Sequence, residues 1–471
     1  MVKEAGAKGQ GATGAAAWSP DSWQGFRADQ DVAYPDAAAL ARATLDLRRL
    51  PPLVTSFEIE RLKEFIADAQ EGKRFVLQGG DCAESLADCD PATISNKLKI
   101  LLQMSLVLVH GSKRPVVRIG RFAGQYAKPR SSATETRTDA AGASETLPSF
   151  FGDLVNRADF TPGSRAPDPN LLLEGYKHAG LTLNFIRSLS DSGFADLHHP
   201  EYWDLSFMQG ARLSVELRTE YQRIVGEVGE ALRFMQALGE QTVDELSRVE
   251  FFTSHEGLNL HYESSQTRTV PRRTGWYDLT THLPWIGERT RALDGAHIEF
   301  FRGIENPVGV KLGPKVTEAD MLALAQALNP KNERGKLLFI VRMGAGNVGG
   351  ALPRLLRAAK REGLRVLWMS DPMHGNTQST ASGRKTRDFD NIIEEITTSM
   401  EVHDAEGTQF GGVHFELTGE DVTECIGGAD GLTEHDLDRN YQSACDPRLN
   451  YRQALEMSLR IARRMRRSLL P

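Results

Sequence analysis

Four side chains that suit a transition-metal site come from four separate parts of the sequence. They are Cys82, His374, Glu416 and Asp446. A thiolate, an imidazole and two carboxylates suit a divalent ion such as Mn, Co, Zn or Fe, whereas Mg and Ca prefer oxygen ligands alone. No local ligand spacing joins them, so each also has a structural interpretation. Cys82 can be a small core residue and His374 a hydrogen-bonded structural histidine. Glu416 can be a hydrogen-bonding partner at a helix cap, and Asp446 can be the N-cap residue of a helical turn that starts at Pro447.

A second group of side chains is basic and gathers near apolar segments and glycine-rich turns. Its members are Arg121, Lys128, Arg130, Arg289, Lys311, Arg342, Lys385 and Arg387. Arginine offers a planar fork to carboxylates and phosphates, while lysine is a compact point charge. Taken singly, each is explained as an exposed surface cation. Lys311 and Arg342 are different, because each follows a run of apolar residues. A site with so many cations predicts a substrate with more than one anionic group.

A glycine motif offers a competing interpretation. Gly344, Gly346 and Gly349 spell G-x-G-x-x-G between an expected strand and an expected helix, and Asp371 follows at the spacing of a ribose-binding acid. However, Arg342 immediately precedes the motif and Asp371 runs at once into PMHGNT. We therefore favour a glycine-rich turn that lets Arg342 approach an anion, with nicotinamide cofactor binding as the alternative.

Eight apolar segments predict strands, and helical periodicity separates most of them. The segments are Phe75–Leu77, Pro115–Ile119, Val249–Thr253, Trp276–Thr280, Val308–Leu312, Leu337–Val341, Arg365–Met369 and Gly412–Leu417. Strands that alternate with helices predict parallel pairing. Eight such units predict an α/β fold of the (β/α)8 TIM-barrel type, whose reacting groups lie at the carboxyl ends of the strands. The polar groups fall at those ends: Cys82, Arg121, His255, Glu288, Lys311, Arg342, His374 and Glu416.

The remaining segments surround this barrel. Residues 1–17 are rich in Gly and Ala and predict a flexible tail, followed by one domain over residues 18–471. An N-terminal helical extension, 36–71, holds the expected helices Asp36–Arg49 and Phe57–Gln70. An insertion over 131–248, between the second and third strands, predicts a long loop to residue 170 and then a helical pair, Glu174–Leu189 and Ala211–Leu238. The helix Tyr451–Leu469 is expected to close the chain.

Composition and charge argue against several classes of protein. The net charge is -7, which argues against nucleic acid as a partner. No apolar run reaches the roughly 18 residues that span a bilayer, and the N-terminus lacks the pattern of a secretory signal. Four cysteines in 471 residues make no disulfide framework. We therefore expect a cytoplasmic protein with reduced thiols and no membrane partner.

A series of ordered segments, from about Trp18 to the C-terminal helix, resembles one enzyme family. The segments are QGGDCAES, RFAGQYAKPRS, SHEG, WIGERTR, VGVKLGP, RMGA, DPMHGNT, GRKTR, GGVHFELTGEDVTECIGG and ACDPRLN. Together they resemble the class II 3-deoxy-D-arabino-heptulosonate 7-phosphate (DAHP) synthases. That family condenses phosphoenolpyruvate with erythrose 4-phosphate and releases phosphate, at the entry to the shikimate pathway.

The resemblance implies a role for each matching residue. It implies a divalent metal, Mn or Co before Zn, Fe or Cd, on Cys82, His374, Glu416 and Asp446. It implies that phosphoenolpyruvate is held by Arg121, Arg289, Lys311 and Arg342, with Trp285 and Glu288 beside them. For erythrose 4-phosphate it implies Lys128, Arg130, Ser131 and Lys385. Lys311, Glu288 and Arg342 are the expected catalytic residues, the first two for proton handling and water placement. The helical pair implies a homodimer or homotetramer and, in some members, an aromatic amino acid feedback ligand.

Departures from the family pattern leave alternatives. SFFGDLVNR stands where a tyrosine and an arginine are expected before Gly-Asp, and TAS precedes GRKTR in place of Ala-Pro-Cys. One alternative is therefore an amino-DAHP synthase or another secondary-metabolism relative with a modified aldose phosphate. Another is a non-catalytic binding or regulatory protein on the same fold. A further hypothesis is redox control through a Cys82–Cys445 disulfide, with a space-filling role as the simpler interpretation of Cys445.

Overall fold

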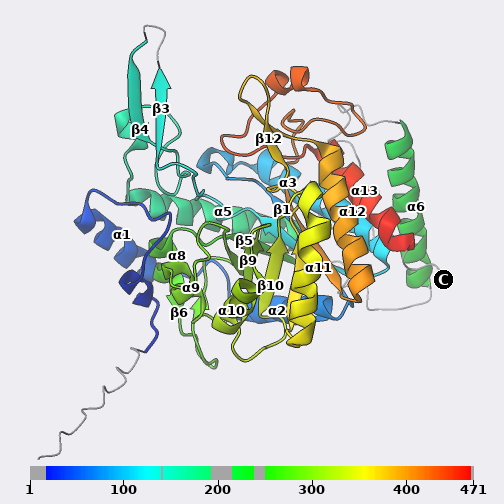
Figure 1. Cartoon of the computed structure of the whole chain (residues 1–471), viewed down its shortest axis with the longest axis horizontal. Helices are drawn as coiled ribbons and strands as arrows, with labels where there is room; N and C mark the ends of the chain where they lie inside the picture. The colour runs from blue at the N-terminus through cyan, green and yellow to red at the C-terminus, as the bar shows by residue number, and fades with distance from the viewer. Residues whose placement is uncertain (1–16, 139–141, 192–214, 238–249, 468–471) are drawn as a thin grey trace, which may run out of the picture.

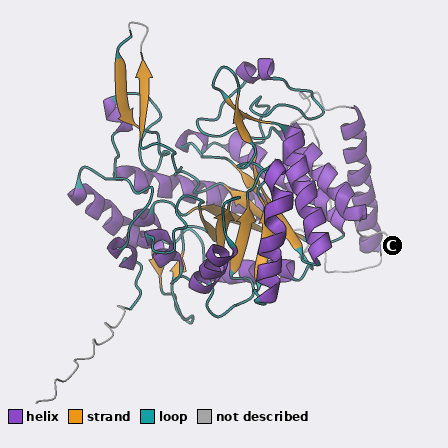
Figure 2. Ribbon diagram, viewed as in Figure 1, coloured by secondary structure: helices purple, strands orange, loops and turns teal. Residues whose placement is uncertain are grey.

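The computed structural model describes residues 17–138, 142–191, 215–237 and 250–467. The predicted tail lies almost wholly outside these residues. Eight parallel strands close into a barrel, each hydrogen-bonded to its two neighbours. Figure 2 shows these strands at the centre of the molecule, with helices around them. They are β1 (Phe75–Gly80), β2 (Val116–Arg121), β5 (Phe251–Glu256), β8 (Leu283–Ile286), β9 (Val308–Leu312), β10 (Leu337–Val341), β11 (Val366–Ser370) and β14 (Phe410–Glu416). The predicted (β/α)8 barrel is confirmed.

The fourth barrel strand is not the predicted one. Trp276–Thr280 contains only β7 (Tyr277–Asp278), which pairs antiparallel with β6 (Thr267–Arg268) outside the barrel. The barrel instead uses β8, which pairs in parallel with β5 and β9. Strand β8 is short and contains Pro284, which has no N–H to give to a ladder. The strand pattern of Leu283–Ile286 in the sequence is therefore weaker than that of the predicted strand Trp276–Thr280.

The predicted long loop at residues 131–170 contains a hairpin. Strands β3 (Thr134–Thr138) and β4 (Ser144–Pro148) pair antiparallel, and the short helix α4 (Pro162–Arg165) follows. Cross-strand threonines contribute, since Thr136 Oγ1 lies 2.8 Å from Thr146 Oγ1. The hairpin projects from the body of the molecule (Figure 1). Both faces of the hairpin are mostly polar. Its sequence therefore lacks the alternation of apolar and polar residues that indicates a half-buried strand.

The N-terminal helices α1 (Ala37–Arg49) and α2 (Ser56–Gln70) and the C-terminal helix α13 (Tyr451–Arg467) lie close to their predicted ranges. Further helices connect the barrel strands: α3 (Pro91–Ser112), α8 (Leu260–Gln266), α9 (Ala296–Phe301), α10 (Glu318–Leu328), α11 (Ala345–Arg361) and α12 (Phe389–Glu406). Capping boxes begin two of them, Thr55 with Glu58 and Thr317 with Asp320. Helix α11 begins at Ala345, and its first turns are rich in glycine, which weakens the helical pattern in the sequence.

Among the described residues, two long helices follow α4 and precede β5, where the insertion was expected. These are α5 (Asn170–Asp191) and α6 (Val215–Ala237), and both contact α3. The connection between them and the predicted end of the second helix at Leu238 lie outside the described residues. The extent of a single domain over 18–471 stays a prediction.

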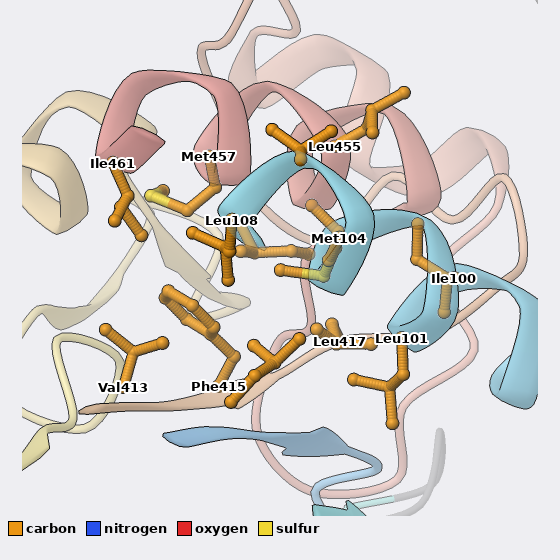
Figure 3. Close-up of a cluster of buried hydrophobic side chains, with 14 of the residues drawn as sticks. Ile100, Leu101, Met104, Leu108, Val413, Phe415, Leu417, Leu455, Met457 and Ile461 are labelled. Atoms are coloured by element: carbon orange, nitrogen blue, oxygen red, sulfur yellow. The ribbon is translucent and has the colours of Figure 1, made fainter. Parts of the chain in front are cut away.

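Helix α3 is the main link between the barrel and the C-terminal helix. Its residues Leu101, Met104 and Leu108 pack in one cluster with β14 and α13, which Figure 3 shows between the two helices and the strand. Helix α3 is long and apolar enough to cross a membrane, but two thirds of its most apolar window is buried inside the fold. At the other side, Leu62 and Phe65 of α2 pack on interior barrel residues and close the end opposite the mouth.

Candidate active site

Strand register places several polar side chains inside the mouth of the barrel. Gly80, the last residue of β1, is paired with Arg121 on one side and with Glu416 on the other. Gln78, two residues earlier, is paired with His414. Because side chains alternate along a strand, these residues share the inner face in two layers. The mouth is therefore charged, while the layers below it are apolar.

The four predicted metal ligands meet at this mouth. Ligand atoms of Cys82, Glu416 and Asp446 all lie within 4.8 Å of one another. His374 joins them, because its Nε2 lies 3.0 Å from Glu416 Oε1. Cys82 follows β1, His374 follows β11, Glu416 ends β14, and Asp446 precedes α13. The fold thus gathers residues that no local motif connects.

A cation of the chain itself lies among these ligands. The Nζ atom of Lys128 is 2.7 Å from Cys82 Sγ, 2.9 Å from Asp446 Oδ2 and 3.6 Å from Glu416 Oε1. The ammonium group stands where a metal ion would meet the same three donors. Sulfur, nitrogen and carboxylate donors around a cation fit a borderline divalent metal. The residues present therefore fit the metal that the sequence predicts.

The carboxylates of this cluster are held in their charged form. Burial alone would raise the pKa of Glu416, but the charges of His374, Lys128 and the arginines outweigh it and keep this pKa well below its ordinary value. Burial likewise opposes ionisation of Asp446, and Lys128 keeps its pKa far below the usual range. Burial raises the pKa of the Cys82 thiol well above its ordinary value, so a metal must displace that proton.

A buried ion network fixes two of the ligands. Arg448 Nη1 lies 2.8 Å from Asp81 Oδ1, and Arg448 also holds both oxygens of Glu424, at 2.8 and 3.1 Å. Asp81 directly precedes Cys82, and Arg448 lies two residues after Asp446. The network therefore joins the end of β1 to the loop before α13, which are far apart in the sequence.

The DPMHGNT loop is held by its own aspartate. Asp371 Oδ1 accepts from the backbone nitrogens of Met373 and His374, at 3.0 and 3.3 Å. Asp371 Oδ2 lies 2.7 Å from His374 Nδ1, which turns Nε2 of that ring toward Glu416. Lys311 forms an ion pair with the same oxygen. Asp371 therefore positions the histidine.

The glycine motif is explained by a close approach of two loops. Gly344 has a φ of +84°, and a Cβ there would lie 2.8 Å from the carbonyl oxygen of Gly375. Nearby, Arg342 Nη2 donates to the backbone oxygen of His374 at 2.9 Å. The glycines let the turn after β10 lie against the turn after β11, and no nucleotide is needed to account for them.

Predicted phosphoenolpyruvate residues form a second part of the mouth. Arg121 is buried, lies 3.1 Å from Glu416 Oε1, and holds its guanidinium 5.1 Å from the centroid of the Trp285 ring. Lys311 lies 5.8 Å from the same centroid. Burial lowers the pKa of Lys311 to about 8, even though Asp371 opposes the shift. An amine with a pKa near neutral can exchange a proton during turnover.

The other predicted residues differ in how far they join the cluster. Lys385 Nζ lies 2.8 Å from Asp446 Oδ1, and Arg130 Nη1 lies 3.7 Å from Cys445 Sγ. Glu288 lies near the mouth but is engaged by Gly313 N at 2.7 Å and by a neighbouring arginine. Arg289 and Ser131 are exposed, and the structure brings neither into contact with the cluster. Their substrate roles stay predictions.

Sequence reasoning missed three residues of the mouth. At the end of β5 it selected His255, whose Nε2 lies 2.9 Å from Glu263 Oε1. The next residue, Glu256, has a buried oxygen without a hydrogen-bond partner, and burial raises its pKa while the cations of the mouth oppose the shift. His414 lies 2.7 Å from Arg121, and strand alternation could have identified it. Arg387 was counted among the cations but not assigned to the site; it is fully buried, with Nη1 2.7 Å from Glu416 Oε2.

The second cysteine at the mouth is a neighbour of the first. Cys445 is hydrogen-bonded to Cys82, and this bond contributes to the pKa shifts of both thiols. It lowers the pKa of Cys445 to about 7, against the effect of burial. Both are free thiols in the structure.

Comparisons with known proteins identify the family of the chain. Residues 18–462 match the family model described as the class-II DAHP synthetase family. The phospho-2-dehydro-3-deoxyheptonate aldolase of Neurospora crassa is 47% identical over 461 residues, which cover 94% of both chains. The enzymes of that name from Streptomyces coelicolor and Mycolicibacterium smegmatis are 45% and 42% identical, over 94% and 92% of this chain and 96% and 91% of theirs. A solved DAHP synthase from Thermotoga maritima aligns with a TM-score of 0.31 and 12% identity, over 83% of this chain and 68% of that one, a likeness too weak to carry an argument.

The family match spans nearly the whole chain, and the relatives share its length. The chain therefore belongs to the class II DAHP synthase family, the transferases that condense phosphoenolpyruvate with erythrose 4-phosphate in the first step of the shikimate pathway.

Proposed function

We propose that this condensation takes place at the mouth of the barrel, where Cys82, His374, Glu416 and Asp446 would hold a divalent ion. The observation that supports it is the position of Lys128, whose ammonium group is enclosed by three of these four residues. A metal bound there acts as a Lewis acid that polarises the aldehyde oxygen of erythrose 4-phosphate. Mn or Co is the proposed ion, with Zn, Fe or Cd as other candidates.

The chain's own residues bind and orient the two anions. Arg121, Lys311 and Arg342 hold the carboxylate and phosphate of phosphoenolpyruvate, with Trp285 against its face and Arg289 reaching in from the rim. Lys128, Arg130, Ser131 and Lys385 hold erythrose 4-phosphate from the opposite side. Bringing two anions together against their repulsion is positioning and electrostatic work. The methylene carbon of phosphoenolpyruvate then attacks the aldehyde carbon.

Proton handling belongs to Lys311 and Glu288. As the new carbon–carbon bond forms, positive charge develops on the adjacent carbon, which bears the phosphate oxygen, and a water adds there. Glu288 orients that water, and Lys311, with a pKa of about 8, exchanges protons with the reacting oxygens. The phosphate group then leaves from the same carbon. Buried Trp285 and the packed interior below it exclude other water.

A single pair of variants tests the location of the site. His374→Ala should lose bound metal and turnover while its far-UV circular dichroism stays that of the wild type. The matched control is His435→Ala, since His435 is exposed on the loop before α13. Metal content by elemental analysis and phosphate release are the measurements. Wild-type metal content in His374→Ala would remove this residue from the proposed ligand set.

The aldose phosphate is erythrose 4-phosphate, and a modified analogue is the second candidate. Its support is the altered SFFGDLVNR segment, which lies directly under the proposed binding loop: the backbone oxygen of Phe151 accepts from the backbone nitrogen of Lys128 at 2.9 Å. Kinetics with erythrose 4-phosphate and its amino or imino analogue decide between them. Equal or better use of erythrose 4-phosphate counts against an amino-DAHP synthase.

Membership in an enzyme family leaves the non-catalytic alternative without support.

The insertion supports a homo-oligomer, a dimer or a tetramer. Apolar residues stay exposed on it and beside it, with Leu181 at 61%, Val215 at 75% and Phe57 at 69%. A second copy of the chain can cover them. Leu181→Lys should lower the mass measured by light scattering, and an unchanged mass would exclude α5 from the contact.

The site proposed for a feedback ligand lies near the same helices. A cavity of about 280 Å³ lies between α2, α5 and β5, with Leu183, Ile186 and Phe251 on its walls. An aromatic amino acid is the proposed occupant, and calorimetric titration with the three aromatic amino acids is the measurement.

The four free cysteines support a cytoplasmic location.

A further inference from the structure

A buried carboxylate on α12 bonds the two loops that carry Arg342 and His374. Glu395 Oε1 accepts from the backbone nitrogen of Met343 at 2.8 Å, and Glu395 Oε2 accepts from Asn376 Nδ2 at 2.7 Å. Met343 follows Arg342 in the turn after β10, and Asn376 lies two residues after His374 in the turn after β11. One side chain outside the mouth therefore touches both turns.

The two turns are also in direct contact, so their relative position is defined. Asn376 Oδ1 accepts from the backbone nitrogen of Ala345 at 3.0 Å. Gly344 lies so close to Gly375 that no Cβ fits between them. Arg342 Nη2 donates to the backbone oxygen of His374. A shift of one turn against the other would thus move a proposed substrate cation and a proposed metal ligand together.

The charge of Glu395 is not explained by an ion pair. Its side chain has no exposed surface, and among residues 17–138, 142–191, 215–237 and 250–467 it forms no salt bridge. Burial raises its pKa to about 7, although N–H groups of Met343 and Gly344 oppose the shift. An uncompensated buried carboxylate is costly. What it supplies is two acceptor oxygens and no donor, which is what two converging N–H groups require.

We propose that Glu395 is a positioning residue that sets Arg342 and His374 against each other, through Met343 and Asn376, for the reaction at the mouth. The inference rests on the proposed roles of Arg342 and His374. It places the alignment of the phosphoenolpyruvate site and the metal site under the control of one residue on α12.

The donor and acceptor pattern allows a test by exchange. In Glu395→Gln the new amide N–H group faces Asn376 Nδ2, so two donors oppose each other. In Asn376→Asp two carboxylates oppose each other. The double variant, Glu395→Gln with Asn376→Asp, restores one donor and one acceptor between the two side chains and keeps the net charge. The donation from Asn376 Nδ2 to the backbone oxygen of Pro372, at 2.8 Å, is lost in both variants that contain Asn376→Asp. Glu394→Gln is the matched control, because Glu394 is the exposed neighbour on the same helix.

The measurements are the Kd for Mn, the KM for each substrate, and kcat. In Glu395→Gln we expect the Kd for Mn and the KM for phosphoenolpyruvate each to rise about tenfold, as for other partners that orient metal ligands, with the KM for erythrose 4-phosphate unchanged. The double variant should have lower values of both constants than either single variant, although the lost bond to Pro372 keeps them above those of the wild type. Glu394→Gln should match the wild type.

Three results would overturn the inference. One is wild-type Mn and phosphoenolpyruvate constants in Glu395→Gln. Another is a uniform loss over both substrates, with a lowered Tm and no rescue in the double variant, as a merely structural role predicts. If Glu395→Gln does not fold, the double variant decides, and its own failure to fold would overturn the inference too. Arg342→Lys and His374→Ala run in parallel: if these leave both constants unchanged, the proposed site itself is wrong.

Discussion

The ammonium nitrogen of Lys128 lies 2.7 Å from the sulfur of Cys82. It also lies 2.9 Å from Asp446 Oδ2, so the lysine fills the space between two of the proposed metal ligands. A divalent ion and this ammonium group would repel each other across that space. A metal held by these ligands would therefore displace Lys128 from this position.

Replacing Lys128 should separate metal binding from substrate binding. In Lys128→Met the Kd for Mn should fall about tenfold, which corresponds to about 1.4 kcal/mol, because the competing cation is gone. The KM for erythrose 4-phosphate should rise. Lys385→Met is the control, since Lys385 touches Asp446 from an exposed position and should change the Kd for Mn less. Calorimetry measures the first constant, and weaker Mn binding in Lys128→Met would contradict the expectation.

The thiolate should decide which metals bind best. Cys82→Ser replaces a soft sulfur ligand by a hard oxygen, so affinity for Zn, Co and Cd should fall more than affinity for Mn. Competition titrations on the apoprotein measure the ratio. Cys89→Ser serves as the control, because Cys89 is hydrogen-bonded to Thr182 away from the mouth. An equal loss for all metals in Cys82→Ser would show that sulfur does not set the preference.

Glu256 should be needed for turnover while it lowers stability at high pH. Its folded-state pKa is raised, first by burial, so the protonated form is favoured in the folded protein. Its stabilising contribution is complete below the unfolded pKa and is lost as the pH rises through the folded one. Glu256→Gln should therefore have the higher urea midpoint at pH 8, with a smaller difference at pH 5, and a lower kcat. If the urea midpoints of the wild type and Glu256→Gln differ by the same amount at pH 8 and at pH 5, this role is refuted.

His403 should make the fold sensitive to mild acid. Burial lowers its pKa to about 4, where it packs near Phe410 and lies 2.7 Å from Thr408 Oγ1. The unfolded chain binds this proton first, so stability is lost as the pH falls from about 6.5 toward 4. Between pH 7.5 and 5.5 the wild type should lose about 1.4 kcal/mol more than His403→Gln in the free energy of unfolding. Identical losses in the two proteins would contradict the assignment.

Oxidation should inactivate the enzyme reversibly if the neighbouring thiols form a disulfide. Cys82 and Cys445 are hydrogen-bonded, and a disulfide would take the thiolate away from the metal. Air-oxidised or glutathione-treated protein should lose Mn binding together with one pair of thiols, and dithiothreitol should restore both. Cys445→Ser should keep its activity under the same treatment. Full activity in a wild-type protein that has lost both thiols would end the hypothesis.

Much of the architecture follows from local patterns. Five-residue apolar segments such as Val308–Leu312 and Leu337–Val341 are strands in the structure with the predicted bounds. A buried parallel strand is apolar on both faces, so it stands out in the sequence. The hairpin β3–β4 and the strand β8 did not, because one is polar on both faces and the other is four residues long with a proline in it.

What the sequence by itself determined is the barrel, the family and the residue types at the strand ends. Only the tertiary structure decided which of these residues meet. A one-residue difference turns a side chain from the inside of the barrel to the outside, so Glu256 enters the mouth while His255 bonds to Glu263. Cys82 and Asp446 are 364 residues apart in the sequence and touch because the ion pair between Arg448 and Asp81 joins the loop before α13 to the end of β1.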